Sequence, residues 1–301
     1  MAPRDEQEFE AERAAVKRAS AKSDASRKSE SGPSVLLVSG LGVGGPSQDG
    51  LRLQMLLEHV SGETLPDSEL LSAGSGANVA RMIVAGGGIS SLEGDGVPAA
   101  IKELDLSLSG FCAALPVDVM PGATDPSNHM MPQAPIHPCL MPISQSFQSL
   151  NCTPNPYSAR IGGLKFLGTS GQPIQDMRKY SSQPNDETAM QVDGDDEGTQ
   201  ESAAPVPPEE IHALELSLKA RHLAPTAPDS LAAFPFTQDD PFVIAAEDCP
   251  DVYFCGGASK FATKVLDNGT RLICVPRFEE TGEAVRVDLE TLEADVICFE
   301  C

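Results

Sequence analysis

The sequence predicts an α/β protein in which two sheets form a sandwich flanked by helices. Two observations lead to this prediction. Apolar strand-like runs alternate with amphipathic segments over residues 34–122, and short strand-like runs follow one another from residue 252 onward. With 301 residues, of which 41% are hydrophobic, the chain is long enough to bury one sizeable core or two small ones.

The first half of the chain alternates between predicted strands and predicted helices. Three apolar runs predict buried strands, at residues 34–39, 79–87 and 115–122. Two segments between these runs have an apolar face at helical spacing and predict helices, at residues 48–60 and 98–113. This order favours a mainly parallel sheet that is covered by helices.

The second half predicts another helix and then a second sheet. Residues 208–223 begin with Pro and two Glu residues and end with Lys, Arg and His, which suits the dipole of a helix. Five strand-like runs follow from residue 252, and Asp-Asn-Gly at 267–269 predicts a hairpin turn. We therefore expect a second, largely antiparallel sheet. A dinucleotide-binding domain would instead continue as repeated strand–helix–strand units.

Two segments have the composition of solvated chain. Residues 1–33 are of mixed charge and rich in Ala and Ser, and residues 183–210 carry nine acids and no base. Segments with little apolar surface and high charge do not form a packed core. We therefore predict a disordered segment at 1–33 and one folded domain at 34–301 with a disordered acidic insertion at 183–210. A tolerated surface loop is the favoured interpretation of the insertion, and a regulated tether is the alternative.

The net charge, the lack of a long apolar run and the cysteines argue against a DNA-binding surface, a membrane helix, secretion and a zinc site. The formal charge is −23 and the isoelectric point is about 4.4, so the whole surface is a poor partner for DNA phosphates. No apolar run reaches the length of a membrane helix, and the charged N-terminus does not resemble a secretory signal. The eight cysteines are therefore expected to be reduced thiols in a cytosolic or nuclear protein. Cys298 and Cys301 form a lone C-x-x-C, which supplies too few ligands for zinc.

A glycine pattern follows the first predicted strand. Gly40-x-Gly42-x-x-Gly45 precedes a predicted helix, as in a loop that binds the pyrophosphate of a dinucleotide. Glu63 and Asp67 lie at a sequence distance that suits a ribose contact. A nucleotide-binding oxidoreductase is therefore one hypothesis, although the expected series of strand–helix–strand units does not follow.

A second interpretation of these glycines comes from all the loops that follow predicted strands. The loops lie at residues 39–45, 85–90, 120–126, 168–172 and 255–261. In the same order they resemble the metal-binding loops of the calcineurin-like metallophosphoesterases. The motifs of that family are D-x-H, G-D-x-x-D, G-N-H-D, a lone His and G-H-x-H, and they hold two metal ions that activate water.

Nearly every ligand position of that pattern is occupied by a residue that cannot replace a carboxylate or an imidazole. Asp125 is retained, and none of the five histidines falls on a ligand position. The resemblance therefore implies an inactive domain, with no catalytic residue, no metal and no cofactor. The ligand positions that have been lost are Gly40, Gly42, Gly87, Ser90, Ala123, Thr124, Ser170, Gly257 and Ser259.

Longer segments resemble the B-subunits of the replicative DNA polymerases, and within that family the delta branch. They include the runs Gly-Thr-Ser-Gly-Gln at 168–172 and Arg-His-Leu-Ala-Pro-Thr-Ala-Pro-Asp at 221–229. The alpha and epsilon branches are the alternatives, as is a working metallophosphoesterase. The resemblance covers residues 34–298, with departures near 91–112 and at the acidic insertion. The segments that carry it lie at 116–142, 155–182, 218–236 and 240–261.

The resemblance implies a scaffold in the nucleus. B-subunits dock the C-terminal metal-binding module of the catalytic subunit, here that of DNA polymerase delta, and we expect contact with DNA to be at most indirect. Family members place an oligonucleotide/oligosaccharide-binding barrel before the phosphoesterase-like domain. The 33 residues that precede the first predicted strand are too few for such a barrel. Family members make contacts through this barrel, above all with a third accessory subunit. That subunit therefore stays a candidate partner, but a weaker expectation than the catalytic subunit.

Several other residues have both a structural and a functional interpretation. Three polar residues are expected near the metal-binding loops but are too few for a two-metal site: Asp118, Asp125 and His129. Four basic residues could touch a DNA backbone, although pairing with surface acids is favoured: Arg178, Lys179, Lys219 and Arg221. His137 is expected to be packed and hydrogen-bonded. Three aromatic residues in an irregular segment are candidates for an interface or for the core: Phe234, Phe236 and Phe242.

Overall fold

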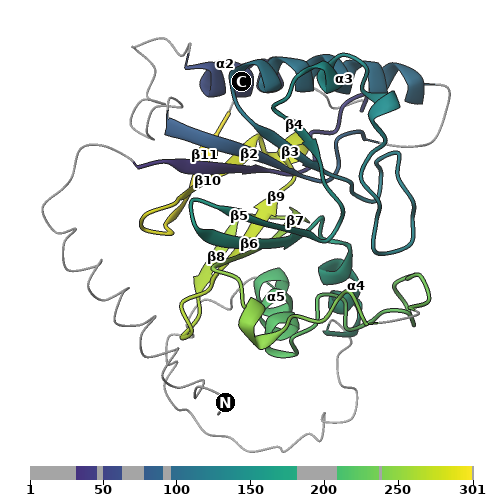
Figure 1. The fold of residues 1–301 in the computed structure, drawn as a ribbon, viewed down its shortest axis with the longest axis vertical. Coiled ribbons are helices and arrows are strands. Elements are labelled where there is room, and N and C mark those ends of the chain that lie inside the picture. Colours follow the sequence, from purple (N-terminus) through teal and green to yellow (C-terminus); the bar gives the residue numbers. More distant parts are fainter. Residues whose placement is uncertain are drawn as a thin grey trace, which may run out of the picture.

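The computed structural model describes residues 32–45, 50–62, 78–90, 96–181, 209–236 and 239–299. These residues form four layers, in which two sheets pack face to face and helices cover the outer face of each sheet (Figure 1). The predicted two-sheet sandwich flanked by helices is confirmed. The segment at 1–33 lies outside the described residues except for Gly32 and Pro33, and the acidic insertion lies outside them except for its last two residues.

The first sheet has six strands in the order β11-β10-β1-β2-β3-β4. The first four in chain order pair in parallel: β1 (Ser34–Val38), β2 (Val79–Ala85), β3 (Val117–Met120) and β4 (Leu150–Cys152). Two later strands complete the sheet in antiparallel pairing, β10 (Glu283–Asp288) and β11 (Ala294–Cys298). The three strands predicted in the first half are therefore confirmed, as is their mainly parallel arrangement.

The second sheet has five strands in the order β5-β6-β7-β9-β8. Its strands are β5 (Tyr157–Ile161), β6 (Leu164–Thr169), β7 (Val252–Ala258), β8 (Ala262–Val265) and β9 (Arg271–Pro276). The three central strands pair in parallel and the two edge strands pair in antiparallel fashion. Gly269 has a φ of 83° and donates its N–H to the carbonyl of Leu266, which confirms the predicted hairpin turn.

The prediction of a largely antiparallel second sheet is wrong in two respects. The hairpin places β8 at the edge of the sheet, so β9 returns between β8 and β7 and runs parallel to β7. Pro276 then ends β9, and Arg277 bridges to Ser39 at the end of β1. The short helix α6 (Phe278–Thr281) carries the chain across, so that β10 and β11 join the first sheet.

Helices cover the outer faces of the two sheets (Figure 1). The first sheet is covered by α2 (Gly50–Ser61) and α3 (Val97–Ala114), and the second by α4 (Gln172–Ser181) and α5 (Glu209–Lys219). Three short 3-10 helices lie in the connections, η4 (Pro138–Leu140), η5 (Ser144–Ser146) and η6 (Ala246–Asp248). In the described part of the chain, no helix combines the length and the apolar composition that crossing a membrane requires.

The helix predicted at 208–223 ends four residues early, because the chain turns away after Lys219. Arg221 adopts a left-handed backbone with a φ of 53°, and His222 forms an isolated bridge with Val243. A non-glycine residue in this conformation cannot continue a right-handed helix. Glu209 and Glu210, which were assigned to the acidic insertion, form the first turn of α5.

The strands of both sheets contribute to three apolar layers. Leu36 of β1 faces α2 and α3 together with Leu104 and Phe111. Val35 faces the opposite way, toward the second sheet, where it lies in the same apolar cluster as Phe254. All five residues of β1 are buried, as expected for a parallel strand with packed layers on both sides. A third cluster packs α5 on the outer face of the second sheet.

Candidate functional site

The five loops named above come together at one edge of the sandwich. They lie at the carboxyl ends of β1, β2, β3, β6 and β7, which run parallel within their sheets, so these ends meet. Ser39 Oγ donates to the carbonyl of Ala85 at 2.9 Å and accepts from the N–H of Gly257 at 2.8 Å. The first sheet is thereby joined to the second. We call these loops, at 39–45, 85–90, 120–126, 168–172 and 255–261, the glycine-loop cluster.

Backbone N–H groups of the loop after β1 donate hydrogen bonds to the loop after β2. Gly40 donates to Gly86 O at 2.9 Å and Gly42 donates to Gly87 O at 3.0 Å. In a dinucleotide-binding turn such N–H groups face a pyrophosphate. Here they are already used within the protein. Glu63 and Asp67, the acids at a ribose-binding distance in the sequence, lie outside the described residues.

Backbone segments touch one another where the metallophosphoesterase pattern would place metal ligands. Gly86 and Gly87 have φ values of 78° and 72°. A Cβ atom at Gly87 would lie 2.9 Å from Cα of Gly40, and one at Gly122 would lie 2.7 Å from N of Gly87. Real Cβ atoms do not approach backbone this closely. The glycines therefore allow three loops to pack against one another without side chains between them.

The retained Asp125 holds these loops together. Its Oδ2 atom accepts from the N–H of Gly87 and of Gly122, both at 2.8 Å, and its Oδ1 atom accepts from the N–H of Ile89 at 3.1 Å. The side chain is buried, and this burial raises the pKa of Asp125 although the backbone N–H groups oppose the shift. Both carboxylate oxygens are therefore engaged by the backbone.

A buried amide network links the loop after β3 to the loop after β6. Asn155 donates from Nδ2 to Ser170 Oγ at 2.7 Å and to Gln133 Oε1 at 2.8 Å. Gln133 in turn donates from Nε2 to the carbonyl of Gly122 at 3.1 Å. Ser170, at the position of the lone His, is thus bonded to the side chain of Asn155.

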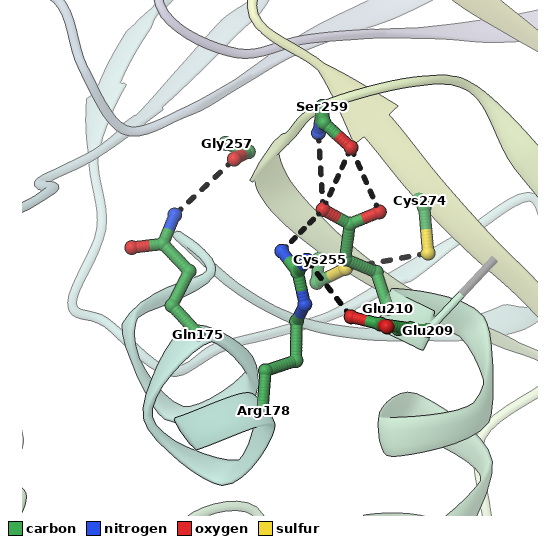
Figure 2. A network of polar contacts seen from close by, with 8 residues as sticks. All are labelled: Gln175, Arg178, Glu209, Glu210, Cys255, Gly257, Ser259 and Cys274. Atoms are coloured by element: carbon green, nitrogen blue, oxygen red, sulfur yellow. Dashed lines mark hydrogen bonds and ion pairs between the residues drawn. The ribbon is translucent and has the colours of Figure 1, made fainter. Parts of the chain in front are cut away.

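At the carboxyl end of β7, the carboxylate of Glu210 from α5 is hydrogen-bonded to the side chain of Ser259 (Figure 2). Glu210 is buried and its carboxylate accepts from Ser259 Oγ, at 2.9 Å to Oε1 and 3.1 Å to Oε2. Arg178 of α4 donates to Glu210 Oε1 at 2.8 Å and to Glu209 Oε2 at 3.1 Å. Gln175 donates from Nε2 to the carbonyl of Gly257 at 3.2 Å. Both ligand positions of the G-H-x-H motif are therefore bonded to helix residues.

Three further positions of the metal-ligand pattern, Gly42, Ser90 and Thr124, contact or bond to other residues of the domain. A Cβ atom at Gly42 would lie 1.9 Å from Oε2 of Glu279, so this carboxylate fills the space beside the glycine. The backbone of Ser90 donates to Val43 O at 3.1 Å, and Thr124 Oγ1 donates to Ile89 O at 2.7 Å. Ala123 is exposed.

These residues do not fit a two-metal centre. Imidazoles are absent from the ligand positions, and the one carboxylate retained there, Asp125, is fully bonded to backbone N–H groups. Among the residues that the structure describes, no three His, Cys, Asp or Glu side chains gather as a metal site would require. That these positions once bound metal stays a prediction from the resemblance.

The other polar candidates, Asp118, His129 and His137, do not add metal-binding groups to the glycine-loop cluster. Asp118 belongs to a polar cluster between the sheets, where it accepts from Arg81 and from Tyr157 OH, each at 2.6 Å. His129 is exposed. His137 is exposed rather than packed, although its Nδ1 accepts from the N–H of Cys139 at 3.2 Å, so the expected hydrogen bond is present and the expected burial is not.

The basic and thiol candidates behave largely as surface and core groups. Arg178, Lys179 and Lys219 each pair with a carboxylate, which agrees with the favoured surface-pairing interpretation. Arg221 is exposed. In the part of the chain that the structure describes, free thiols include those of Cys112, Cys139, Cys152, Cys249, Cys255 and Cys274. Of the C-terminal C-x-x-C, Cys301 lies outside the described residues.

Sequence reasoning missed four residues that organise the cluster, namely Gln133, Asn155, Glu210 and Glu279. Glu210 was assigned to the acidic insertion and to the favourable first turn of a helix. Its burial follows from Arg178 and Ser259, which are 32 and 49 residues away in the chain. No local pattern signals contacts of that range. Gln133 and Asn155 lie in two different connections, before η4 and after β4, and likewise carry no periodic signal.

A family model and several named proteins that resemble this chain all describe subunits of DNA polymerases. Residues 35–263 match the family described as the DNA polymerase alpha/epsilon B-subunits. The chain is 35% identical over 88% of its length to proteins named DNA polymerase delta small subunit from Oryza sativa and Arabidopsis thaliana, and it covers 59% and 57% of them. It is 32% identical to the Saccharomyces cerevisiae protein of that name, over 87% of this chain and 55% of that protein. The resemblance found in the sequence is thereby confirmed, and the chain spans little more than half the length of these relatives.

One solved structure resembles this chain more distantly. It is described as a novel archaeal phosphodiesterase, it is 13% identical, and it matches with a TM-score of 0.41. The match covers 88% of this chain and 98% of that one. A TM-score this low is no basis for inferring a shared site or activity.

Proposed function

The chain belongs to the DNA polymerase alpha/epsilon B-subunit family, and from that premise we propose that it is the scaffold region of the small subunit of a DNA polymerase delta. The observation that supports the delta branch is 35% identity over 88% of this chain to proteins named DNA polymerase delta small subunit. In this proposal the chain acts in the nucleus and has no catalytic activity of its own.

The state of the glycine-loop cluster supports a role without catalysis. An active metallophosphoesterase needs carboxylates and imidazoles that point into an open cleft. This chain has glycine loops that touch one another, and Asp125, Ser170 and Ser259 are bonded to other parts of the protein. A fold that keeps its loops but uses them as packing surface contributes shape and surface rather than chemistry.

The proposed partner is the C-terminal metal-binding module of the catalytic subunit of polymerase delta. The experiment is co-purification of the full 301-residue chain with this module, with the corresponding modules of polymerases alpha and epsilon as specificity controls. Retention of the delta module alone is expected. Retention of the alpha or epsilon module in its place would move the chain to another branch. Failure to retain any module by a chain that unfolds cooperatively would overturn the scaffold proposal.

A further inference from the structure

Exposed apolar side chains gather on the segment that follows α5. Phe234 and Phe236 are 44% and 40% exposed, and Met130, on the strand-like stretch beside them, is 37% exposed. Phe234 donates its N–H to the carbonyl of Met131 at 2.9 Å, which places the two stretches side by side. We call Met130, Phe234 and Phe236 the aromatic patch. Phe242, the third aromatic residue of this segment, is fully buried, so it belongs to the core.

The aromatic patch is held in place by the folded domain. The Phe236 ring contacts the buried Phe242 ring edge to face, with centroids 5.6 Å apart. Asp240 fixes the next turn, because it accepts from the N–H of Phe242 at 2.9 Å and bonds to His222 Nε2 at 3.0 Å. Side chains braced in this way lose little conformational freedom on binding, which favours their use as anchors.

The segment that carries the patch has an unusual charge. Residues 222–251 contain six acids and no Lys or Arg, and the nearest base before them is Arg221. Asp240 bonds to His222 and Asp248 pairs with Lys165, whereas Asp229 and Asp239 are exposed beside the aromatic residues in sequence. Apolar anchors flanked by exposed carboxylates are complementary to apolar side chains flanked by cations.

We propose that the aromatic patch is the docking surface for a basic segment of the catalytic subunit's C-terminal module, in which apolar side chains are flanked by Lys or Arg. This inference rests on the proposed function and names the surface that performs it. Exposed aromatic clusters are uncommon on monomeric proteins, and aromatic residues are enriched at interface centres. The acidic segment then attracts the partner and the aromatic rings hold it.

The test measures the affinity of the recombinant delta module for the full chain and for two pairs of variants. F234A/F236A removes the aromatic anchors, and L51A/L106A is its matched control. Leu51 of α2 and Leu106 of α3 are 51% and 63% exposed, and these two helices cover the first sheet. D229K/D239K reverses two charges of the segment, and E103K/E293K makes the same change in net charge elsewhere. Thermal unfolding of each variant shows that the fold is kept.

We expect F234A/F236A to weaken binding by about tenfold or more, since exposed aromatic anchors carry a large share of interface energy. D229K/D239K should weaken binding and also reduce its dependence on salt. If the unchanged chain binds but all variants bind equally well, the docking surface is wrong while the scaffold proposal stands. If the unchanged chain does not bind the module, both fail. If F234A/F236A instead abolishes self-association, the patch is covered by a second copy and the inference is overturned.

Discussion

Arg178 Nη1 lies 2.8 Å from Glu210 Oε1, while Nη2 of the same guanidinium lies 3.1 Å from Glu209 Oε2. The two neighbouring glutamates differ in their surroundings, since the Glu210 side chain is 7% exposed and that of Glu209 is 59% exposed (Figure 2). One cation therefore joins α4 to a buried and to an exposed carboxylate at the start of α5. The contribution of each carboxylate to stability should follow its burial.

Replacement of these glutamates by glutamine separates the two contributions. Glu210→Gln leaves Ser259 and Arg178 with a weaker acceptor in a buried position, so we expect a loss of about 1–3 kcal/mol in the free energy of unfolding. Glu209→Gln is the matched control and should cost no more than about 0.5 kcal/mol, because exposed ion pairs contribute little. Urea denaturation of both variants is the measurement. Equal losses would show that the buried bond to Ser259 adds nothing.

The close packing of the glycine-loop cluster predicts a large effect of one methyl group. Gly86→Ala would place a Cβ atom 2.6 Å from Cβ of Ser170 and 2.9 Å from Cα of Gly122. We expect a loss of more than about 3 kcal/mol, or failure to fold. Gly62→Ala is the control, because Gly62 has a similar φ of 74° but no atom within 4 Å of the added Cβ. It should show only the left-handed strain of about 1–2 kcal/mol. Similar losses at both sites would contradict the contact argument.

The order of elements could be predicted because it depends on local patterns. The apolar run of β1 and the helical spacing of Leu104 and Leu108 in α3 both act over a few residues. Strand partners could not be predicted in the same way. β10 pairs with β1 rather than with β9 because Pro276 ends β9 and Arg277 then bridges to Ser39. Arg277 and Ser39 are more than 200 positions apart in the chain.

For the glycine-loop cluster too, some features could be predicted from local sequence and others could not. The meeting of the five loops follows from parallel strands, and single residues such as Gly40 and Gly87 show that these positions carry neither a carboxylate nor an imidazole. The contacts that these positions make in the folded domain are long-range. Nothing near Gly42 in the sequence indicates that Glu279 lies over it, and nothing near Ser259 indicates Glu210.

Asp125 should be essential to the packing of the glycine-loop cluster. Asp125→Asn keeps the shape of the side chain, but its amide nitrogen cannot accept from the backbone N–H groups of Gly87 and Gly122. We expect a loss of about 2–3 kcal/mol from these unpaired buried donors. Asp239→Asn, at an exposed carboxylate, should change stability by less than about 0.5 kcal/mol. Urea denaturation of the two variants would refute the assignment if their losses were the same.

His59 predicts that stability falls at mildly acidic pH. Its side chain is 2% exposed, Nε2 has no hydrogen-bond partner among the residues that the structure describes, and the ring packs against Phe299 with centroids 5.7 Å apart. Burial, and then the charge of Arg286, lower the pKa of His59 below its usual 6.5. The unfolded chain therefore binds a proton below pH 6.5 that the folded chain does not bind. The free energy of unfolding falls with decreasing pH, by at most about 1.4 kcal/mol per pH unit from this group.

His59→Phe isolates this effect, because phenylalanine keeps the aromatic contact with Phe299 and does not titrate. The difference in unfolding free energy between the variant and the unchanged chain should grow in favour of the variant as the pH is lowered from 7 to 5.5, a range chosen to cross the usual histidine pKa of about 6.5. His129→Gln, at an exposed histidine, should leave the pH dependence unchanged. Parallel pH curves for the unchanged chain and His59→Phe would rule out His59 as the cause.

The glycine-loop cluster predicts that the purified chain contains no stoichiometric Mn, Fe or Zn and does not hydrolyse a generic phosphodiester such as bis-p-nitrophenyl phosphate. The ligand positions lack imidazoles, and both oxygens of Asp125 already accept from the backbone.

Restoring single ligands should not create activity either. A histidine at Gly42 would collide with the carboxylate of Glu279, and an aspartate at Gly87 would collide with the backbone of Gly40. Elemental analysis and a hydrolysis assay, run beside an active metallophosphoesterase, test this directly. Two bound metal ions per chain together with turnover that Asp125→Ala abolishes would show that the cluster can open into a catalytic cleft, and the scaffold interpretation of these loops would have to be given up.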